Sequence, residues 1–359
     1  MAIPSPASGR EIRVLVVDDS AFMRRALERL IEKMPGVVVA GSAGDGLEAI
    51  KRALELRPDV ITMDVEMPNM DGVTAVGEIM QTVPTPIVMV STLTSAGADT
   101  TIRALEAGAV EAIAKPSGLS HELANVGEKL AEAIQRASFA RVQRRRPQLL
   151  VSLRAVVPSP AAAPGRASSQ VLVIGCSTGG PPALTEVVPH LPGDLNAAVL
   201  VVQHMPAGFT AALARRLNSL SPLTVAEAVD GEPIVSGRVL IAPGDFHMQV
   251  TRDRRVRLDQ GPAVHGVRPS VDITLNSVAE IYGGNAAVAI LTGMGRDGAD
   301  GAARVEQAGG KVITQDEATC VVYGMPRVTK ERTQNPQEFA LDRIADALTR
   351  ALPGLRGAR

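Results

Sequence analysis

The chain has 359 residues, of which 45% are hydrophobic and only 2% aromatic, with no tryptophan and a formal net charge of -1. This length favours two domains, and the near-neutral charge and scarce aromatic side chains argue against nucleic-acid and anionic-membrane partners. No cationic and apolar leader opens the sequence, and no apolar run reaches the roughly 20 residues of a spanning helix. The two cysteines, Cys176 and Cys320, are too few for a disulfide framework, so we expect a cytoplasmic protein without membrane insertion.

Short β-like runs alternate with helical patterns between residues 11 and 137. The runs span residues 12–17, 37–40, 60–63, 86–90 and 110–113. Five strands with helices between them predict a parallel, doubly wound α/β domain. In the first helix, Phe22, Ala26, Leu30 and Ile31 form an apolar stripe that we expect to face the core.

The composition changes over residues 138–169, where arginine, proline, alanine and serine interrupt any sustained apolar period. We interpret this segment as an extended, mobile linker with a solvated basic cluster. Residues 170–355 again alternate between β-like and helical patterns, which predicts a second α/β domain with a mainly parallel, Rossmann-like sheet. Its clearest β-like runs are 171–175, 198–203 and 286–292. Alternation around a central turn predicts a charged hairpin at 247–258.

Polar side chains follow the predicted strands of the first domain. Asp18 and Asp19 end the first strand and Asp64 ends the third, so the three carboxylates can converge at the carboxyl edge of the sheet. Clustered anions of this kind suit Mg²⁺, which binds oxygen ligands and recruits phosphate oxygens. Ser91 and Lys115 follow the fourth and fifth strands. The set therefore describes a carboxylate that accepts a phosphoryl group.

These segments resemble the receiver domain of two-component response regulators, over roughly residues 11–137. They read V-V-D-D-S, M-D-V-E-M-P-N-M-D-G, M-V-S and A-K-P, in that order. The resemblance implies a flavodoxin-like fold in which a sensor histidine kinase phosphorylates Asp64. The other roles that it implies are Mg²⁺ ligation by Asp18 through water, by Asp19 and Asp64 directly and by the Glu66 carbonyl, and phosphate sensing by Ser91 and Lys115.

A glycine-flanked serine ends the first β-like run of the second domain. Ser177, between Gly175 and Gly179, fits the G-x-S-x-G pattern, in which a sharp strand-to-helix turn exposes a nucleophilic hydroxyl. A serine needs a base and the base needs an orienting carboxylate. His204 and Asp297 follow two other predicted strands, so all three side chains could lie at one sheet edge. The order Ser, His, Asp differs from that of α/β-hydrolases.

Other side chains could fill the same two roles. The competing residues are His190, His247, His265, Asp272 and Asp300. His190 comes late in a helical stretch and His247 lies in the predicted hairpin, whereas His265 lies in a loop and stays a candidate base. Asp272 could instead cap a helix. A nucleotide-phosphate loop fits poorly, because the run lacks G-x-G-x-x-G.

Six further segments of the second domain are, in chain order, G-C-S-T-G-G, V-V-Q-H-M-P, A-P-G-D-F-H, H-G-V-R-P-S-V-D, L-T-G-M-G-R-D-G and V-Y-G-M-P. With them the domain resembles the catalytic domain of the chemotaxis protein-glutamate methylesterases. The likeness implies that Ser177 is the nucleophile, His204 the general base and acid, and Asp297 the orienting carboxylate, with a backbone N–H near Met294 in the oxyanion hole. Cys176 stands where alanine is more usual, and we expect its side chain to pack inside.

Together the two likenesses imply a phosphorylation-regulated hydrolase of glutamate 5-methyl esters on methyl-accepting chemoreceptors. Methanol is released, receptor glutamines are also deamidated, and the ester reaction needs no cofactor. The unphosphorylated receiver is expected to obstruct Ser177 until a chemotaxis sensor histidine kinase phosphorylates Asp64. The alternatives are a response regulator with a non-catalytic, protein-binding output domain and an esterase for a small molecule.

Overall fold

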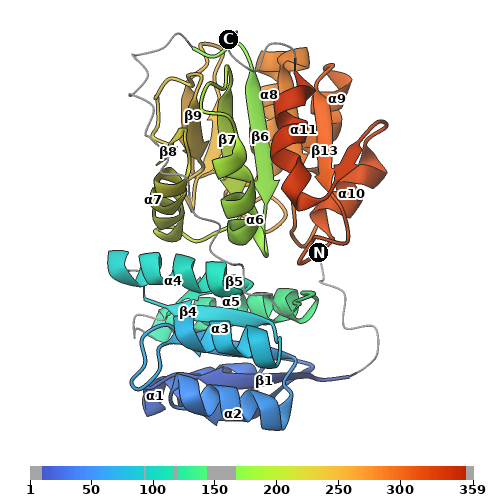
Figure 1. Ribbon diagram of the computed structural model, residues 1–359. Coiled ribbons are helices and arrows are strands. Elements are labelled where there is room, and N and C mark those ends of the chain that lie inside the picture. Colours follow the sequence, from blue (N-terminus) through green and yellow to red (C-terminus); the bar gives the residue numbers. More distant parts are fainter. Residues whose placement is uncertain (1–9, 93, 116–119, 144–166, 353–359) are drawn as a thin grey trace. The chain divides into compact units, whose positions relative to one another are not determined.

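The computed structural model describes residues 10–92, 94–115, 120–143 and 167–352 of the chain, with helices on both faces of each of two sheets (Figure 1). The chain divides into two compact units, Met1–Val151 and Ser152–Arg359. Most of the predicted linker, including its cluster of three consecutive arginines, lies outside the described residues, as does the predicted end of the second domain at residue 355.

The first unit contains the predicted five-stranded sheet, in the order β2-β1-β3-β4-β5 with every pair parallel. Its elements are β1 (Ile12–Val17), α1 (Ala21–Ile31), β2 (Val37–Ala43), α2 (Gly46–Leu56), β3 (Val60–Asp64), α3 (Gly72–Thr82), β4 (Ile87–Ser91), α4 (Ser95–Ala107), β5 (Glu111–Ala114) and α5 (Ser120–Ser138). The central strands β3 and β4 are buried along their whole length because helices cover them on both faces. The predicted doubly wound class is confirmed.

Local sequence fixes how the chain turns at the carboxyl edge of this sheet. Ser20 caps α1 by accepting a hydrogen bond from the Met23 N–H, and Asp71 caps α3 in the same way through Thr74. Gly72 must be glycine, because a Cβ there would lie 2.1 Å from the carbonyl oxygen of Asp64. The chain after β3 therefore folds tightly back over Asp64.

The predicted apolar stripe of α1 is wrong at its first residue. Phe22 is 80% exposed, whereas Leu27 and Ile31 are buried. At 100° per residue, Phe22 lies about 140° around the helix from Leu27 and about 180° from Ile31, so it cannot share their face. Ala26 and Leu30 are only half-buried beside that face.

The observed orientation of α1 predicts that two truncations in this helix have unequal effects on stability. Leu27→Ala should lower the unfolding free energy of the first unit by about 3 kcal/mol, because it leaves a cavity in the core. Phe22→Ala should change it by less than about 0.5 kcal/mol. Amide hydrogen exchange in β1 of the full chain measures both values, and an equal loss in the two variants would contradict the orientation of α1.

The second unit contains a seven-stranded parallel sheet in the order β14-β13-β12-β6-β7-β9-β8. Its helices are α6 (Gly180–Val187), α7 (Phe209–Leu220), α8 (Val271–Tyr282), α9 (Ala299–Gln307), α10 (Met325–Arg332) and α11 (Ile344–Ala351), with short 3-10 turns at Val188–His190, Gly283–Asn285 and Leu341–Arg343. Its strands are β6 (Val171–Cys176), β7 (Ala198–Gln203), β8 (Thr224–Glu227), β9 (Arg238–Ile241), β10 (His247–Val250), β11 (Val256–Asp259), β12 (Ala286–Ile290), β13 (Lys311–Gln315) and β14 (Gln337–Phe339).

Two features of this unit match the sequence expectations. The mainly parallel sheet is confirmed, with β6, β7 and β12 at the predicted apolar runs. The predicted hairpin is the antiparallel pair β10 and β11, in which His247 faces Asp259 in register. The hairpin packs on α8, and buried side chains of both elements join one core with β6, β7 and β12. That core fixes the sheet edge at which the candidate residues lie.

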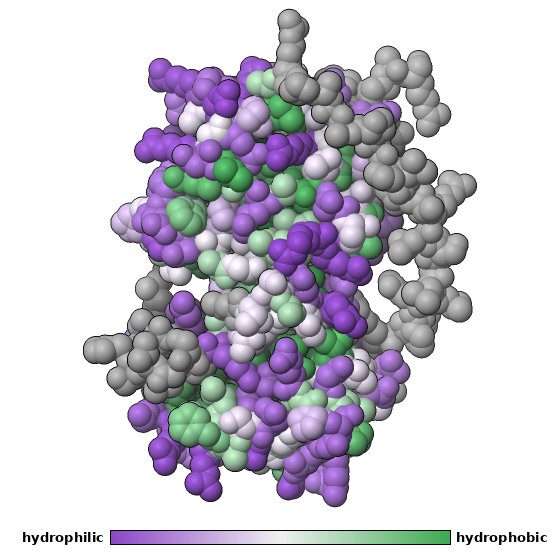
Figure 2. Space-filling view, turned by 90° about the vertical axis from the view of Figure 1, so that its left-hand side faces the viewer, coloured by the Kyte–Doolittle hydropathy of each residue, from purple (hydrophilic) through white to green (hydrophobic). Residues whose placement is uncertain are grey.

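The visible surface carries hydrophilic residues throughout, with hydrophobic residues in small groups between them (Figure 2). None of the helices in the described ranges is both long enough and apolar enough to cross a lipid bilayer.

Candidate functional site

Three charged side chains meet at the carboxyl edge of the first sheet. Asp18 follows β1, Asp64 ends β3 and Lys115 follows β5, and both carboxylates are buried. The Nζ atom of Lys115 lies 2.6 Å from Asp64 Oδ2 and 2.9 Å from Asp18 Oδ2. One ammonium group thus bridges two carboxylates that would otherwise repel each other.

Burial and charge act against each other at Asp64. Burial is the largest influence and raises its pKa, and the nearby charge of Asp18 raises it further, whereas Lys115 and the Val65 N–H lower it. The pKa of Asp64 ends above its ordinary value. For Lys115, burial opposes the charged form, but the bonds to the two carboxylates prevail and raise its pKa, so the ammonium stays charged at neutral pH.

The acidic cluster has the donor set that a hard divalent cation requires. Asp18, Asp19 and Asp64 each offer a carboxylate oxygen, and these atoms lie within 4.8 Å of one another. Asp18 Oδ2 is buried and lies 2.9 Å from the Nζ atom of Lys115. A set of carboxylate oxygens alone fits Mg²⁺. Glu66 is exposed in the loop beyond β3.

Ser91 lies at the same edge, but its hydroxyl points elsewhere. The Lys115 N–H donates to the carbonyl of Ser91 over 2.7 Å, so the two backbones are neighbours. The Ser91 hydroxyl lies 3.3 Å from the Thr92 carbonyl and 3.4 Å from the Gly97 carbonyl, at the start of α4. The structure therefore brings Lys115 to Asp64 and leaves the Ser91 hydroxyl bonded to the loop and helix that follow it.

In the second unit, Ser177 and His204 occupy adjacent strand ends. Cys176 of β6 is in register with Gln203 of β7, and the next residue on each strand is Ser177 or His204. The His204 N–H donates to the Cys176 carbonyl over 3.1 Å, which carries the pairing one step further. The turn into α6 passes through Gly179 at φ 77°, which a residue with a Cβ rarely adopts.

His204 and Asp297 are joined directly. His204 Nε2 lies 2.7 Å from Asp297 Oδ2, and both side chains are buried. Neither the Ser177 hydroxyl nor His204 Nδ1 makes a hydrogen bond with any residue in the described ranges. The structure thus pairs the predicted base with the predicted carboxylate and sets the serine on the neighbouring strand.

Asp297 is held by the amino end of α8. Its carboxylate accepts four hydrogen bonds, from His204, from the Ser270 hydroxyl at 2.7 Å, and from the backbone N–H groups of Val271 and Asp272 at 2.6 and 3.1 Å. Burial alone would raise its pKa, but the histidine, the hydroxyl and the helix N–H groups lower it to about 2. Asp297 is therefore an anion throughout the physiological pH range.

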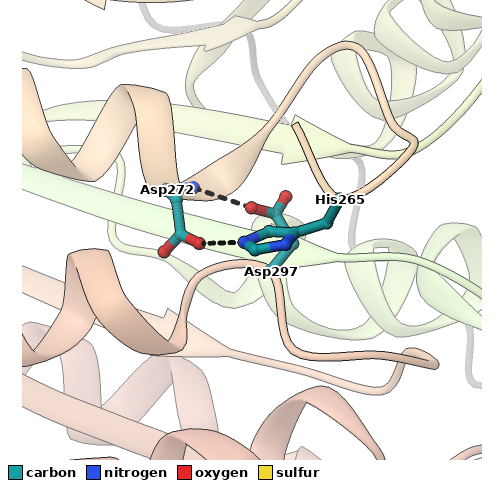
Figure 3. Close-up of side chains that lie close together, drawn as sticks. All are labelled: His265, Asp272 and Asp297. Carbon is teal, nitrogen blue, oxygen red and sulfur yellow. Dashed lines mark hydrogen bonds and ion pairs between the residues drawn. The ribbon is translucent and has the colours of Figure 1, made fainter. Parts of the chain in front are cut away.

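The competing loop histidine forms a second pair with a competing aspartate. His265 Nε2 lies 3.1 Å from Asp272 Oδ2, and the Asp272 N–H points at Asp297 (Figure 3). Burial and the charge of Asp297 raise the pKa of Asp272, although the Gly301 N–H and His265 oppose this. Donor atoms of the three residues lie within 4.8 Å, but the Asp297 carboxylate already accepts four hydrogen bonds. The trio therefore does not fit a metal ion.

The remaining competitors are bonded to residues other than Ser177. His190 contacts the Glu186 carbonyl on the surface, and Asp300 pairs with Arg332. His247 is buried, accepts a hydrogen bond from the Ser270 N–H at Nδ1 and has its Nε2 3.0 Å from the Pro262 carbonyl.

The loop after β12 passes close to the serine at Gly293. A Cβ on Gly293 would lie 2.8 Å from Ser177 Cβ, so only glycine permits this approach. The Met294 N–H, one residue on, donates to no described acceptor. Cys176 is fully buried, with its Sγ 4.0 Å from the Val202 carbonyl, and burial raises the pKa of its thiol. It is inert beside the serine.

The sequence analysis assigned no function to two polar residues that the structure places at this site. Ser270 bonds to Asp297, and Gln203 bonds to the backbone beside Ser177 and His204. Both lie inside the segments quoted above, Ser270 just before α8 and Gln203 just before His204, and that placement was the one available signal.

The pKa of Asp297 predicts a loss of stability in acid. Because its folded value of about 2 lies below its ordinary value of 3.8, its contribution is fully present above pH 4 and is lost as the pH falls toward 2. The loss should be on the order of 2 kcal/mol. Urea unfolding followed by tyrosine fluorescence measures it, since both tyrosines, Tyr282 and Tyr323, lie in the second unit.

Asp297→Asn should lose this pH dependence. Asp300→Asn, which removes an exposed carboxylate three residues away, is the matched control and should retain it. Equal behaviour of the two variants between pH 2 and pH 4 would contradict the bonded anion at Asp297.

Comparisons with known proteins match both units. Residues 14–126 match the response regulator receiver domain, and residues 172–348 match the CheB methylesterase. The chain is 48% identical to a protein-glutamate methylesterase/protein-glutamine glutaminase of Symbiobacterium thermophilum, over 96% of this chain and 98% of the relative. A protein of the same name from Thermotoga maritima is 49% identical over 89% of this chain and 92% of its own length.

Among solved structures, the CheB methylesterase catalytic domain of Thermotoga maritima is 45% identical, covering 51% of this chain and 98% of that one with a TM-score of 0.49. The identity over nearly the whole chain decides the family. The chain belongs to the protein-glutamate methylesterase/protein-glutamine glutaminase family of hydrolases, with a receiver domain ahead of its CheB methylesterase domain.

Proposed function

We propose that this chain is a cytoplasmic, phosphorylation-regulated enzyme that hydrolyses glutamate 5-methyl esters on methyl-accepting chemoreceptors and releases methanol, in the adaptation of chemotaxis. The single observation that carries the proposal is the hydrogen bond between His204 and Asp297, with His204 at the end of the strand that pairs with the strand of Ser177. The names of the relatives support this substrate and add deamidation of protein glutamines. The receiver spans residues 11–137 and the catalytic domain residues 170–355.

The proposed proton path starts from the anionic Asp297. Because His204 Nε2 donates to this carboxylate, the neutral ring carries its lone pair on Nδ1. Nδ1 takes the proton of the Ser177 hydroxyl, whose oxygen attacks the ester carbonyl of the substrate. Asp297 stabilises the imidazolium that forms.

The tetrahedral intermediate then collapses to an acyl-enzyme. Its oxyanion accepts a hydrogen bond from the Met294 N–H, and the imidazolium of His204 returns its proton to the leaving methoxide, so methanol departs. Water, activated by the same nitrogen, attacks the acyl carbon and releases a glutamate carboxylate and Ser177. For a glutamine substrate the leaving group is ammonia. These steps use protein groups and water alone.

Regulation is proposed to act through the first unit, with a chemotaxis sensor histidine kinase as phosphodonor. Asp64 is the proposed phosphoryl acceptor. Asp19, Asp64 and the Glu66 carbonyl would hold Mg²⁺ directly and Asp18 would do so through water, and the bound ion would neutralise charge on the phosphoryl group. Lys115, already bonded to Asp64, would pair with the phosphate.

The switch proposed for the receiver is a rotation of the Ser91 hydroxyl from its carbonyl partners to the phosphate. The new bond would pull on the loop that leads into α4 and change the surface of the receiver. That change weakens an inhibitory contact which obstructs Ser177 in the unphosphorylated enzyme.

Methanol release from methylated receptor fragments tests both sites. With acetyl phosphate and Mg²⁺, the wild type should accelerate, Ser177→Ala should lose at least about a thousandfold in rate because the nucleophile is gone, and Asp64→Asn should keep only the unstimulated rate. Full activity of Ser177→Ala would overturn the catalytic assignment. No release from wild type phosphorylated on Asp64 would favour a non-catalytic output domain.

Removal of residues 1–140 tests the inhibitory contact. The shortened chain should release methanol faster than the unphosphorylated full chain, on the order of tenfold, because a coupling of about 1.4 kcal/mol is lost. Acetyl phosphate should no longer affect it. A rate no higher than that of the unphosphorylated full chain would sink the inhibition model and leave the catalytic assignment untouched.

A further inference from the structure

Gln203 touches the backbone of both proposed catalytic residues. It is the last residue of β7, and its side chain is 2% exposed. Its Nε2 atom lies 3.0 Å from the carbonyl oxygen of Ser177 and 3.0 Å from the carbonyl oxygen of His204. The amide nitrogen of a glutamine carries two hydrogens. The Gln203 amide therefore donates one hydrogen bond to the Ser177 carbonyl and one to the His204 carbonyl.

The other end of this amide is left without a partner. Gln203 Oε1 is buried and accepts no hydrogen bond from any residue that the structure describes, which lowers the stability of the fold. Gly180 faces it closely, because a Cβ there would lie 1.8 Å from Oε1. A buried acceptor kept in this state calls for a reason other than stability.

The catalytic side chains supply that reason. The Ser177 hydroxyl and His204 Nδ1 make no hydrogen bond with a residue of the described chain, so their own bonds do not fix their separation. Their backbones are tied instead by the strand pairing at Cys176 and by Gln203. Small misplacements of reacting groups are expensive, since about 1 Å can cost a hundredfold in rate.

We infer that Gln203 is a positioning residue, which clamps the backbone of Ser177 to that of His204 so that the hydroxyl stays within reach of the base. The inference rests on the proposed function. Gln203 itself touches neither substrate nor reacting atoms. The positioning role of Gln203 also explains why residue 180 is glycine, since a Cβ there would displace the Gln203 amide.

Two variants remove the clamp in different ways. Gln203→Met keeps the length of the side chain and loses both donors, and Gly180→Ala keeps the glutamine and displaces its amide. Thr210→Val is the matched control, because Thr210 lies in the same unit, is also fully buried and has its hydroxyl bonded to Glu227 and to the Gly244 N–H rather than to Ser177 or His204.

Methanol release by the full chain with acetyl phosphate and Mg²⁺ gives kcat and KM. Both clamp variants should lose roughly tenfold to a hundredfold in kcat while KM stays within about twofold. Thr210→Val should retain kcat. A serine-directed phosphonate should inactivate the clamp variants more slowly by the same factor, and circular dichroism establishes that each variant is folded.

Wild-type kcat in either folded clamp variant would overturn the inference, as would an equal loss of kcat in Thr210→Val. If wild type releases no methanol, the proposed substrate is wrong, but the phosphonate rate still decides the role of Gln203: slower inactivation of the clamp variants supports it, and unchanged inactivation refutes it. If one variant fails to fold, the other carries the test.

Discussion

The bonding of the Asp297 carboxylate at the amino end of α8 is the constraint on which the rest of the candidate site depends. A buried anion is tolerated only where donors surround it, and here a hydroxyl, two helix N–H groups and an imidazole do so. The carboxylate joins the loop after β12, the start of α8 and the loop after β7. The orientation of the His204 ring is therefore set by its hydrogen bond to Asp297 and not by the loop that carries His204.

The two units handle buried carboxylates in opposite ways. Asp297 has a donor for each of its lone pairs, and its pKa falls to about 2. Asp64 has one ammonium and one N–H beside it, with another carboxylate nearby, and its pKa rises. The first is closed to any further ligand, which suits a group that only orients a base. The Asp64 carboxylate accepts fewer hydrogen bonds, from Lys115 and from the Val65 N–H, which is what its proposed role as phosphoryl acceptor requires.

Sequence alone predicted the parts of the structure that depend on strand ends. In a parallel sheet, residues after different strands meet at one edge, so Asp18 with Asp64 and His204 with Asp297 could be placed near each other in advance. The predicted buried face of α1 was wrong at Phe22, because this residue is apolar but lies on the side of the helix opposite Ile31. Ser270 was missed because its partner Asp297 is 27 residues away, and Gln203 because its partner Ser177 is 26 residues away. Hydrophobic periodicity does not reveal hydrogen bonds of this kind. Short strands such as β14, with the sequence Q-E-F, contain no apolar run and so could not be predicted from hydrophobicity.

The cysteines give the chain a practical property. The sequence has only Cys176 and Cys320, both thiols are buried, and burial raises the pKa of each. Thiols of this kind are poorly reactive toward alkylating probes, since the thiolate is the attacking form. A cysteine introduced at one exposed position in each unit would therefore take a fluorescent or spin label selectively, without prior removal of the native pair. The distance between the two labels can then be measured by spectroscopy before and after a phosphodonor is added.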